Sequence, residues 1–329
     1  MPVSHAVIQC DAPVYGAHTP LSLRGEGPGV RIMRVVSSLE ELTAERGSWK
    51  ADGGSVGFVP TMGYLHAGHL SLVRRARAEN DTVVVSIFVN PTQFGPQEDL
   101  SRYPRNLPGD LALLEAAGAD VVFTPTVETV YPAGFATYVE PTGLLTERLE
   151  AASRPGHFRG VATVVLKLFN MVRPTRAYFG QKDAQQVAVI RRMVADLNTP
   201  VTLRIMPTIR EADGLAMSSR NSYLGAEDRA AATVLYRALQ AGISAFTEQP
   251  AGGSAAVRAA MAGVIATEPR ATLDYADVCH PDTFAPLETL DDLHAPALLA
   301  IAARVGPARL IDNVVLREDG GWNLGERVE

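Results

Sequence analysis

Short apolar runs alternate with amphipathic segments from about residue 33 onward. The run at residues 82–89 is almost continuously apolar and rich in β-branched side chains, which is typical of a strand covered on both faces of a parallel sheet. In the first amphipathic segment, Leu70, Val73 and Ala76 share one helical face. This alternation predicts an α/β domain built on a Rossmann-like, doubly wound parallel sheet. The predicted strands are 56–59, 82–89, 121–123, 177–179 and 201–206, and the predicted helices are 70–79, 110–117, 161–172 and 183–197.

The pattern changes beyond about residue 208. Two Ala-rich helices are expected near 227–246 and 254–267, followed by strands at 274–279, 298–304 and 309–316. This order predicts a smaller α+β domain, so we divide the chain into residues 33–208 and 209–329. Residues 1–32 have scattered Pro and Gly and no basic segment before an apolar one, which argues against a signal peptide. We interpret them as a disordered extension, or as sequence upstream of a functional start at Met33.

Composition narrows the function classes. Apolar residues make up 47% of the 329 residues and charged residues 20%, as in an ordinary globular enzyme, and no apolar run approaches the ~20 residues that span a bilayer. The formal net charge is −6 and no basic stripe occurs, which disfavours nucleic-acid binding. Cys10 and Cys279 have no neighbouring cysteine or histidine cluster, so no zinc site or disulfide framework is indicated and a cytoplasmic location is expected.

The strongest chemical signal follows the first predicted strand, in the run from Pro60 to His69. His66 and His69 are three residues apart at a predicted helix start, so both side chains can face one point. The free N–H groups and the dipole there, equivalent to about +0.5 charge, favour a phosphate. Gly68 has no Cβ and permits close approach of a nucleotide. The alternative is that these are capping or core histidines.

A second cluster follows the strand at 177–179 and runs from Phe179 to Gln186. Lys182 could supply a positive charge to phosphate oxygens, Asp183 could accept from a ribose hydroxyl, and Gln186 could bond a substrate carboxylate or hydroxyl. The alternatives are an N-cap role for Asp183 and ordinary surface roles for the others.

Three further segments carry polar side chains. Ser218, Ser219 and Arg220 follow a glycine-containing loop that would suit a mobile phosphate clamp, although a polar interdomain linker is the alternative. The run from Asn90 to Gly95 offers uncharged groups that could orient a hydroxy acid, or form a turn. The run from Arg154 to Phe158 offers a cation and an imidazole, and taken alone a structural role is favoured.

Taken together and in order, these clusters resemble the pantothenate synthetases, the pantoate–β-alanine ligases of the His-x-Gly-His nucleotidyltransferase superfamily. The resemblance covers the chain from about Met33 to its C-terminus. It implies a C-terminal lid domain, the use of Mg²⁺ and ATP, and a homodimer. It also implies that His66, His69 and Lys182 hold ATP phosphates and that Ser218, Ser219 and Arg220 close over them. Further nucleotide contacts are implied for Pro60, Thr61, Met62, Gly68, Gly180, Asp183 and Met217, and substrate contacts for Met62, Asn90, Gln93, Gln186, Arg154 and His157.

The resemblance also points to one residue, Asp110, for a metal-linked role. Members of the family commonly have an acidic pair where this chain has Gly109-Asp110, so Asp110 would act alone in any metal-linked role.

The implied reaction converts pantoate to its acyl-adenylate, which then accepts β-alanine and releases AMP. No covalent nucleophile is needed, which agrees with the absence of a Ser-His-Asp or Cys-His signature. Another nucleotidyltransferase of the same superfamily and a nucleotide-sensing module are the remaining alternatives. A class I tRNA synthetase is disfavoured because no basic anticodon-binding domain is present.

Overall fold

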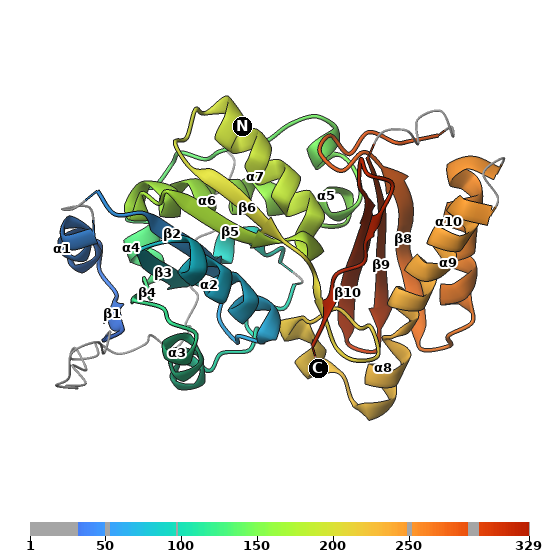
Figure 1. The fold of residues 1–329 in the computed structure, drawn as a ribbon, viewed down its shortest axis with the longest axis horizontal. Coiled ribbons are helices and arrows are strands. Elements are labelled where there is room, and N and C mark those ends of the chain that lie inside the picture. The colour runs from blue at the N-terminus through green and yellow to red at the C-terminus, as the bar shows by residue number, and fades with distance from the viewer. Residues whose placement is uncertain (1–31, 50–52, 97, 249–251, 289–295, 329) are drawn as a thin grey trace, which may run out of the picture.

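Two sheets organise the chain, one parallel and one antiparallel, and helices pack against both (Figure 1). The computed structural model describes residues 32–49, 53–96, 98–248, 252–288 and 296–328. The predicted α/β architecture with a smaller α+β unit is confirmed. Among the described residues, no helix is both long and apolar enough to cross a membrane.

The first sheet has six parallel strands in the order β1-β4-β3-β2-β5-β6. From β2 the chain moves in one direction to β3 and β4, and then it returns to the other side of β2 to form β5 and β6. Ligands bind in open α/β sheets where the order reverses in this way, at the carboxyl ends of the strands. The crevice is therefore expected at the ends of β2 and β5. The strands are β1 (Arg34–Val36), β2 (Val56–Thr61), β3 (Thr82–Ile87), β4 (Val121–Phe123), β5 (Arg176–Gly180) and β6 (Thr202–Met206).

Helices cover both faces of this sheet, which explains why its central strand β3 is almost continuously apolar. Val83 and Val85 of β3 pack in one core cluster with side chains of α2 and α3, whereas Val84 packs in another with α1, α6 and α7. The longer helices are α1 (Leu39–Trp49), α2 (Ala67–Glu79), α3 (Leu107–Ala116), α6 (His157–Val172) and α7 (Ala184–Asp196). The short ones are α4 (Val127–Val130), α5 (Glu150–Ser153) and the 3₁₀ turns η1 (Pro91–Gln93), η2 (Leu144–Thr146), η3 (Gln181–Asp183) and η4 (Ser219–Tyr223).

The second sheet is antiparallel, in the order β11-β10-β9-β8. One of its faces packs on its own helices, and the other contributes to the core of the first sheet. Leu299 and Ile301 of β9 pack with α9 and α10, whereas Leu298 and Ala300 belong to the core cluster of the first sheet. The elements are α8 (Ala226–Ala231), α9 (Val234–Glu248), α10 (Gly253–Ala266), β8 (Ala271–Cys279), β9 (Ala297–Val305), β10 (Ala308–Leu316) and β11 (Trp322–Asn323).

The C-terminal end returns to the junction between the sheets (Figure 1). There β12 (Glu326–Arg327) pairs in parallel with β7 (Ile209–Arg210), the segment that leads from the first unit into the second. The division into residues 33–208 and 209–329 stays a prediction, and residues 1–31 of the predicted extension lie outside the described residues.

Some predicted bounds are wrong. The single helix expected at 227–246 is two helices, because α8 ends at Ala231 and α9 begins at Val234. Helix α6 begins at His157, four residues before the predicted start. Gly118 does follow α3 with φ of 85°, as its left-handed role requires.

Candidate active site

The turn after β2 is held by a buried carboxylate. Gly63 and Tyr64 have φ of 82° and 52°, so the chain bends sharply here. The Asp110 carboxylate accepts from the backbone N–H of Tyr64 (2.8 Å) and of Leu65 (2.7 Å), and Asp110 is only 3% exposed. Asp110 thus fixes the turn that carries the histidines. Its metal role stays a prediction, and both its oxygens already accept from the protein.

His66 and His69 lie side by side at the start of α2, with ring centroids 4.0 Å apart. Burial, and then the neighbouring His69 and the charge of Lys182, lower the pKa of His66 to about 2. Burial lowers the pKa of His69 to about 4, with Asp183 opposing the shift and Lys182 adding to it. Both rings are therefore neutral at physiological pH.

The capping alternative for His66 is also realised. Its Nδ1 accepts from the Gly68 N–H at 3.2 Å, so the neutral ring carries its proton on Nε2. A Cβ at Gly68 would lie 2.9 Å from this ring, so the glycine is needed for the cap itself. Within the described part of the chain, His69 Nδ1 is buried and has no hydrogen-bond partner. His69 thus retains a buried polar atom that none of the described residues uses.

The turn after β5 brings Lys182 and Asp183 to the same place. Asp183 occupies the N-cap position of α7, yet its side chain makes no capping hydrogen bond. Lys182 Nζ lies 3.7 Å from Asp183 Oδ1, and the Asp183 side chain is 48% exposed. The capping explanation therefore does not account for Asp183, and a carboxylate at this turn remains open to a ligand.

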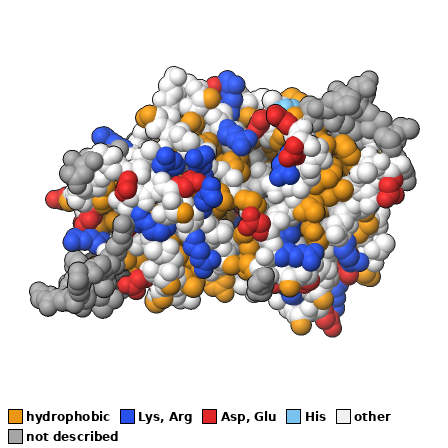
Figure 2. All heavy atoms as spheres, in the orientation of Figure 1, with side chains coloured by type: hydrophobic (Ala, Val, Ile, Leu, Met, Phe, Trp, Pro, Cys, Tyr) orange, Lys and Arg blue, Asp and Glu red, His pale blue; other side chains and the backbone are white. Residues whose placement is uncertain are grey.

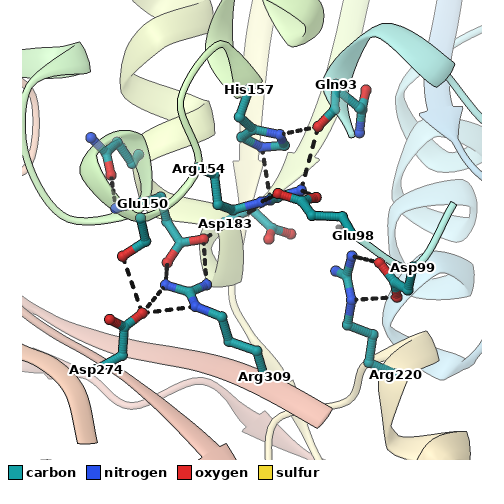
Figure 3. Close-up of polar contacts among 12 residues, drawn as sticks. Gln93, Glu98, Asp99, Glu150, Arg154, His157, Asp183, Arg220, Asp274 and Arg309 are labelled. Carbon is teal, nitrogen blue, oxygen red and sulfur yellow. Dashed lines mark hydrogen bonds and ion pairs between the residues drawn. The ribbon is translucent and has the colours of Figure 1, made fainter. Parts of the chain in front are cut away.

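The loop with Ser218, Ser219 and Arg220 crosses from the second unit to the first. Ser219 Oγ donates to the carbonyl of Tyr64 at 3.1 Å. Arg220 forms two hydrogen bonds with the Asp99 carboxylate, at 3.0 and 2.9 Å (Figure 3). Burial opposes ionisation of Asp99, but the Arg220 contacts outweigh it and the net pKa of Asp99 is lowered. The loop is thus docked beside the histidine turn and is not a free polar linker.

Met62 and Gln93 meet at the end of β3. Gln93 Nε2 donates to Met62 Sδ at 3.2 Å, and its Oε1 accepts from Asn90 Nδ2 at 3.0 Å. Asn90 is 1% exposed and its Oδ1 also accepts from Thr92 and Tyr131. In this structure Asn90 orients Gln93, and its direct contact with a substrate stays a prediction.

Arg154 and His157 are paired with protein groups (Figure 3). Arg154 binds Glu98 through two hydrogen bonds, at 2.9 and 2.6 Å. His157 Nδ1 lies 2.9 Å from the carbonyl of Gln93 and its Nε2 lies 3.1 Å from Arg154, so Nδ1 donates and Nε2 accepts. Burial and then Arg154 lower the pKa of His157 to about 4. Both residues therefore hold the Gln93 segment, and a direct substrate contact stays a prediction.

Sequence reasoning missed an ion-pair cluster between the two units. Arg309 of β10 binds both oxygens of Glu150 at 2.8 and 2.7 Å, and it also contacts Asp274 at 2.6 Å (Figure 3). Tyr275 OH donates to Glu150 at 2.9 Å, and burial raises the pKa of Tyr275 well above its usual value. The available signal was a charged residue at the start of the strand predicted at 309–316.

These groups surround a cavity of about 650 Å³ between the two sheets. On the face drawn in Figure 2, Lys and Arg side chains lie interspersed with Asp and Glu where the units meet. Neither His66 nor His69 is among the lining residues; both lie next to Lys182, which is. The charged and amide side chains that line the cavity include Glu98, Arg154, Lys182, Asp183, Gln186, Arg220, Arg309 and Asn313.

Comparison with known proteins shows which family the chain belongs to. The sequence model of the family described as Pantoate-beta-alanine ligase matches residues 34–315. The chain belongs to the pantoate–β-alanine ligase family. A pantothenate synthetase from Herpetosiphon aurantiacus is 58% identical over 284 residues, which is 86% of this chain and 100% of the relative.

Solved structures of pantoate–β-alanine ligases agree. The chain is similar to pantothenate synthetase from Thermus thermophilus, with 52% identity, a TM-score of 0.80, and coverage of 85% of this chain and 98% of the other. It is also similar to the Francisella tularensis pantoate–β-alanine ligase solved with β-γ ATP and β-alanine, with 34% identity, a TM-score of 0.71, and coverage of 88% and 99%. As a member of this ligase family, the chain is an ATP-dependent enzyme that condenses pantoate with β-alanine.

Proposed function

We propose that the cavity between the two sheets is where this ligase forms pantoyl adenylate and then pantothenate. The observation that carries the proposal is the convergence of the β2 turn and the β5 turn at the reversal of strand order. That convergence places His66, His69 and Lys182 together. Helix α2 also begins there, and its free N–H groups and dipole favour a phosphate.

The first half-reaction needs positioning and charge stabilisation. A carboxylate oxygen of pantoate attacks the α-phosphorus of ATP, and the bond from that phosphorus to the bridging oxygen breaks with release of pyrophosphate. Lys182 and Arg220 supply positive charge to the departing phosphates, and the neutral histidines supply N–H donors, which stabilise charge as it develops. Ser218 and Ser219 complete the clamp from the second unit.

In the second half-reaction the β-alanine amine attacks the acyl carbon and AMP leaves. Pantoate is held by Met62, Gln93 and Gln186. Gln186 lines the cavity, and so does His157, which contacts the Gln93 carbonyl; Gln93 in turn meets Met62 and is oriented by Asn90. The nucleoside lies against Gly180 and Asp183, where the half-exposed Asp183 carboxylate accepts from a ribose hydroxyl. Further contacts come from Pro60, Thr61, Gly68 and Met217.

Magnesium enters as part of the nucleotide substrate. The described residues contain no group of three His, Cys, Asp or Glu side chains that could hold a metal ion. Mg²⁺ at nucleotide sites commonly takes one or two carboxylates plus substrate phosphates. A resident metal cage is therefore not supported by the residues present, whereas an ion carried by the ATP phosphates is compatible with them.

We also propose a homodimer and a cytoplasmic location. Three exposed large apolar side chains, Val127, Tyr138 and Leu144, occur in one stretch between β4 and α6, at 42%, 40% and 44% exposure. A homodimer is what the family resemblance implies, and we place its contact at these side chains. Sedimentation of the wild type and of Tyr138→Asp tests this: the variant should sediment as a smaller species.

The assignment of the reaction is tested by AMP release, measured with pantoate and β-alanine omitted in turn. AMP should appear only with both substrates, whereas ATP–pyrophosphate exchange should require pantoate alone. Exchange that proceeds without pantoate, or AMP release without β-alanine at the full rate, would contradict the proposed sequence of steps.

A further inference from the structure

We infer that Asn313, on β10 of the second sheet, is a positioning residue for the adenylation step. It holds the backbone of the turn that carries Lys182, so the second unit sets where that cation lies. The inference rests on the proposed phosphate role of Lys182.

The contacts of Asn313 are directed at the backbone of this turn. Its Nδ2 donates to the carbonyl of Lys182 at 2.8 Å and to the carbonyl of Gln181 at 3.1 Å. Its Oδ1 accepts from Gln181 Nε2 at 3.3 Å. Both amide hydrogens and the amide oxygen are therefore used on two consecutive residues of the η3 turn. Because the carbonyls are held, the position of the lysine's backbone is fixed, whereas its ammonium group, 3.7 Å from Asp183 Oδ1, is not held by Asn313.

The neighbouring residue holds the other phosphate-binding segment. Asp312 binds Arg210 through two hydrogen bonds, at 2.6 and 2.9 Å, and Arg210 also donates to the carbonyl of Asn313 at 3.3 Å. Arg210 lies in β7, just before the loop that ends in Arg220. Strand β10 contacts both the η3 turn and the η4 turn. Two adjacent side chains of one strand thus set the spacing between the Lys182 turn and the Ser218 to Arg220 clamp.

Packing alone does not explain an asparagine here. Asn313 is 4% exposed in the middle of a strand, where β-branched apolar residues pack best, and Val315 occupies the same face two residues later. A buried amide is unfavourable unless its hydrogen bonds are made. Here all its partners belong to the turn that carries the phosphate-binding lysine.

Replacement of Asn313 is expected to lower the rate of the first half-reaction only. Without the Asn313 amide, Lys182 is displaced from the phosphates, and small misplacements of a catalytic group can lower rates by ~10²-fold. We expect Asn313→Ala to lower pantoate-dependent ATP–pyrophosphate exchange by about tenfold to a hundredfold. The reaction of prepared pantoyl adenylate with β-alanine releases no pyrophosphate, so it should keep its rate.

The experiment compares four single variants and one double variant in both half-reactions, with thermal unfolding as a check on folding. Asn313→Asp keeps the shape and the acceptor for Gln181 but lacks the N–H donors, so it should show the same confined loss as Asn313→Ala. Val315→Ala, on the same strand and face, should leave the ratio of the two half-reactions unchanged. Lys182→Ala should itself impair adenylation, and Asn313→Ala should add little further loss in that background.

The outcomes separate this inference from the proposed function. Equal rate losses in both half-reactions would overturn the positioning role of Asn313. So would a decrease in the adenylation rate on Asn313→Ala that is the same factor with and without Lys182. Normal adenylation in both Asn313 variants, with Lys182→Ala impaired, would overturn it while leaving the lysine's role intact. Normal adenylation in Lys182→Ala would overturn the phosphate role of Lys182 and this inference with it.

Discussion

At the scale of single residues, the two histidines of the β2 turn are donors and not cations. Burial beside the charge of Lys182 keeps both rings neutral, and the Gly68 contact fixes the tautomer of His66. A positive charge on either ring would be repelled by Lys182. Asp183 opposes this effect at His69 but does not outweigh it. The positive charge of the site therefore comes from Lys182 and Arg220, and the imidazoles contribute directed N–H groups.

Replacement of His69 tests this role. Removal of one donor to developing charge typically raises the barrier by ~3 kcal/mol, so His69→Ala should lower turnover by roughly 10²–10³ with folding intact. Steady-state AMP release and thermal unfolding measure the two effects separately. Near-normal turnover would remove His69 from the mechanism.

The buried histidines also predict how stability depends on pH. His66, His69 and His157 have folded pKa values of about 2, 4 and 4, all below the ordinary value of 6.5. Below pH 6.5 the unfolded chain binds protons that the folded chain does not, so the free energy of unfolding should decrease as pH falls from 6.5 to about 4. Each histidine contributes at most about 1.4 kcal/mol per pH unit.

Urea unfolding between pH 7 and pH 5 measures this slope. His69→Gln removes one titrating ring, so its slope should be smaller than that of the wild type. The explanation fails if the two slopes are the same.

At the scale of elements, the sequence predicted strands best where a strand is buried on both faces and nearly all its side chains are apolar. The run at 82–89 was recognisable because helices cover both faces of β3, so almost every position is apolar. The early start of α6 was not predictable, because His157 is polar and its burial depends on Gln93 and Arg154. The two-residue strands β7 and β12 exist through pairing with each other across more than a hundred residues, which leaves no local pattern.

The contact between α6 and the η1 turn gives an element-scale prediction. A Cβ at Gly160 would lie 2.4 Å from the carbonyl oxygen of Thr92 and 2.7 Å from Cα of Gln93. Gly160→Ala should therefore push the turn away and move Gln93 off pantoate. We expect kcat/KM for pantoate to fall by about tenfold to a hundredfold.

Helix α10 provides the matched control for this change. Gly263 has no atom within 4 Å of its would-be Cβ, so Gly263→Ala should leave the kinetics unchanged and stabilise the helix by about 0.5–1 kcal/mol. Unchanged pantoate kinetics in Gly160→Ala would show that the close approach of α6 does not set the position of Gln93.

At the scale of the whole molecule, the site exists only because two units share one core. The family resemblance predicted which residues face the nucleotide, and the structure brings the His66 and Lys182 turns together beside the loop that ends in Arg220. The residues that hold them could not be predicted, because their contacts join distant positions. Arg309 and Glu150 are 159 residues apart, and Asn313 and Lys182 are 131 apart. A single sequence shows that β10 carries polar side chains but not what they meet.

The buried pair of Arg210 and Asp312 is where this long-range organisation can be measured. Their side chains are 1% and 2% exposed, and Arg210 also donates to the carbonyls of Leu324 and Gly214. Asp312→Asn leaves a buried guanidinium without its counter-ion, which typically lowers stability by about 3–5 kcal/mol. Asp282→Asn removes the partner of Arg191 in an exposed pair, at 52% and 47% exposure, where about 0–1 kcal/mol is expected. Urea unfolding of both variants measures the contrast. Equal losses would mean that the junction between the sheets does not depend on this ion pair, whereas a large loss in Asp312→Asn alone would show that the β7 segment is anchored by β10.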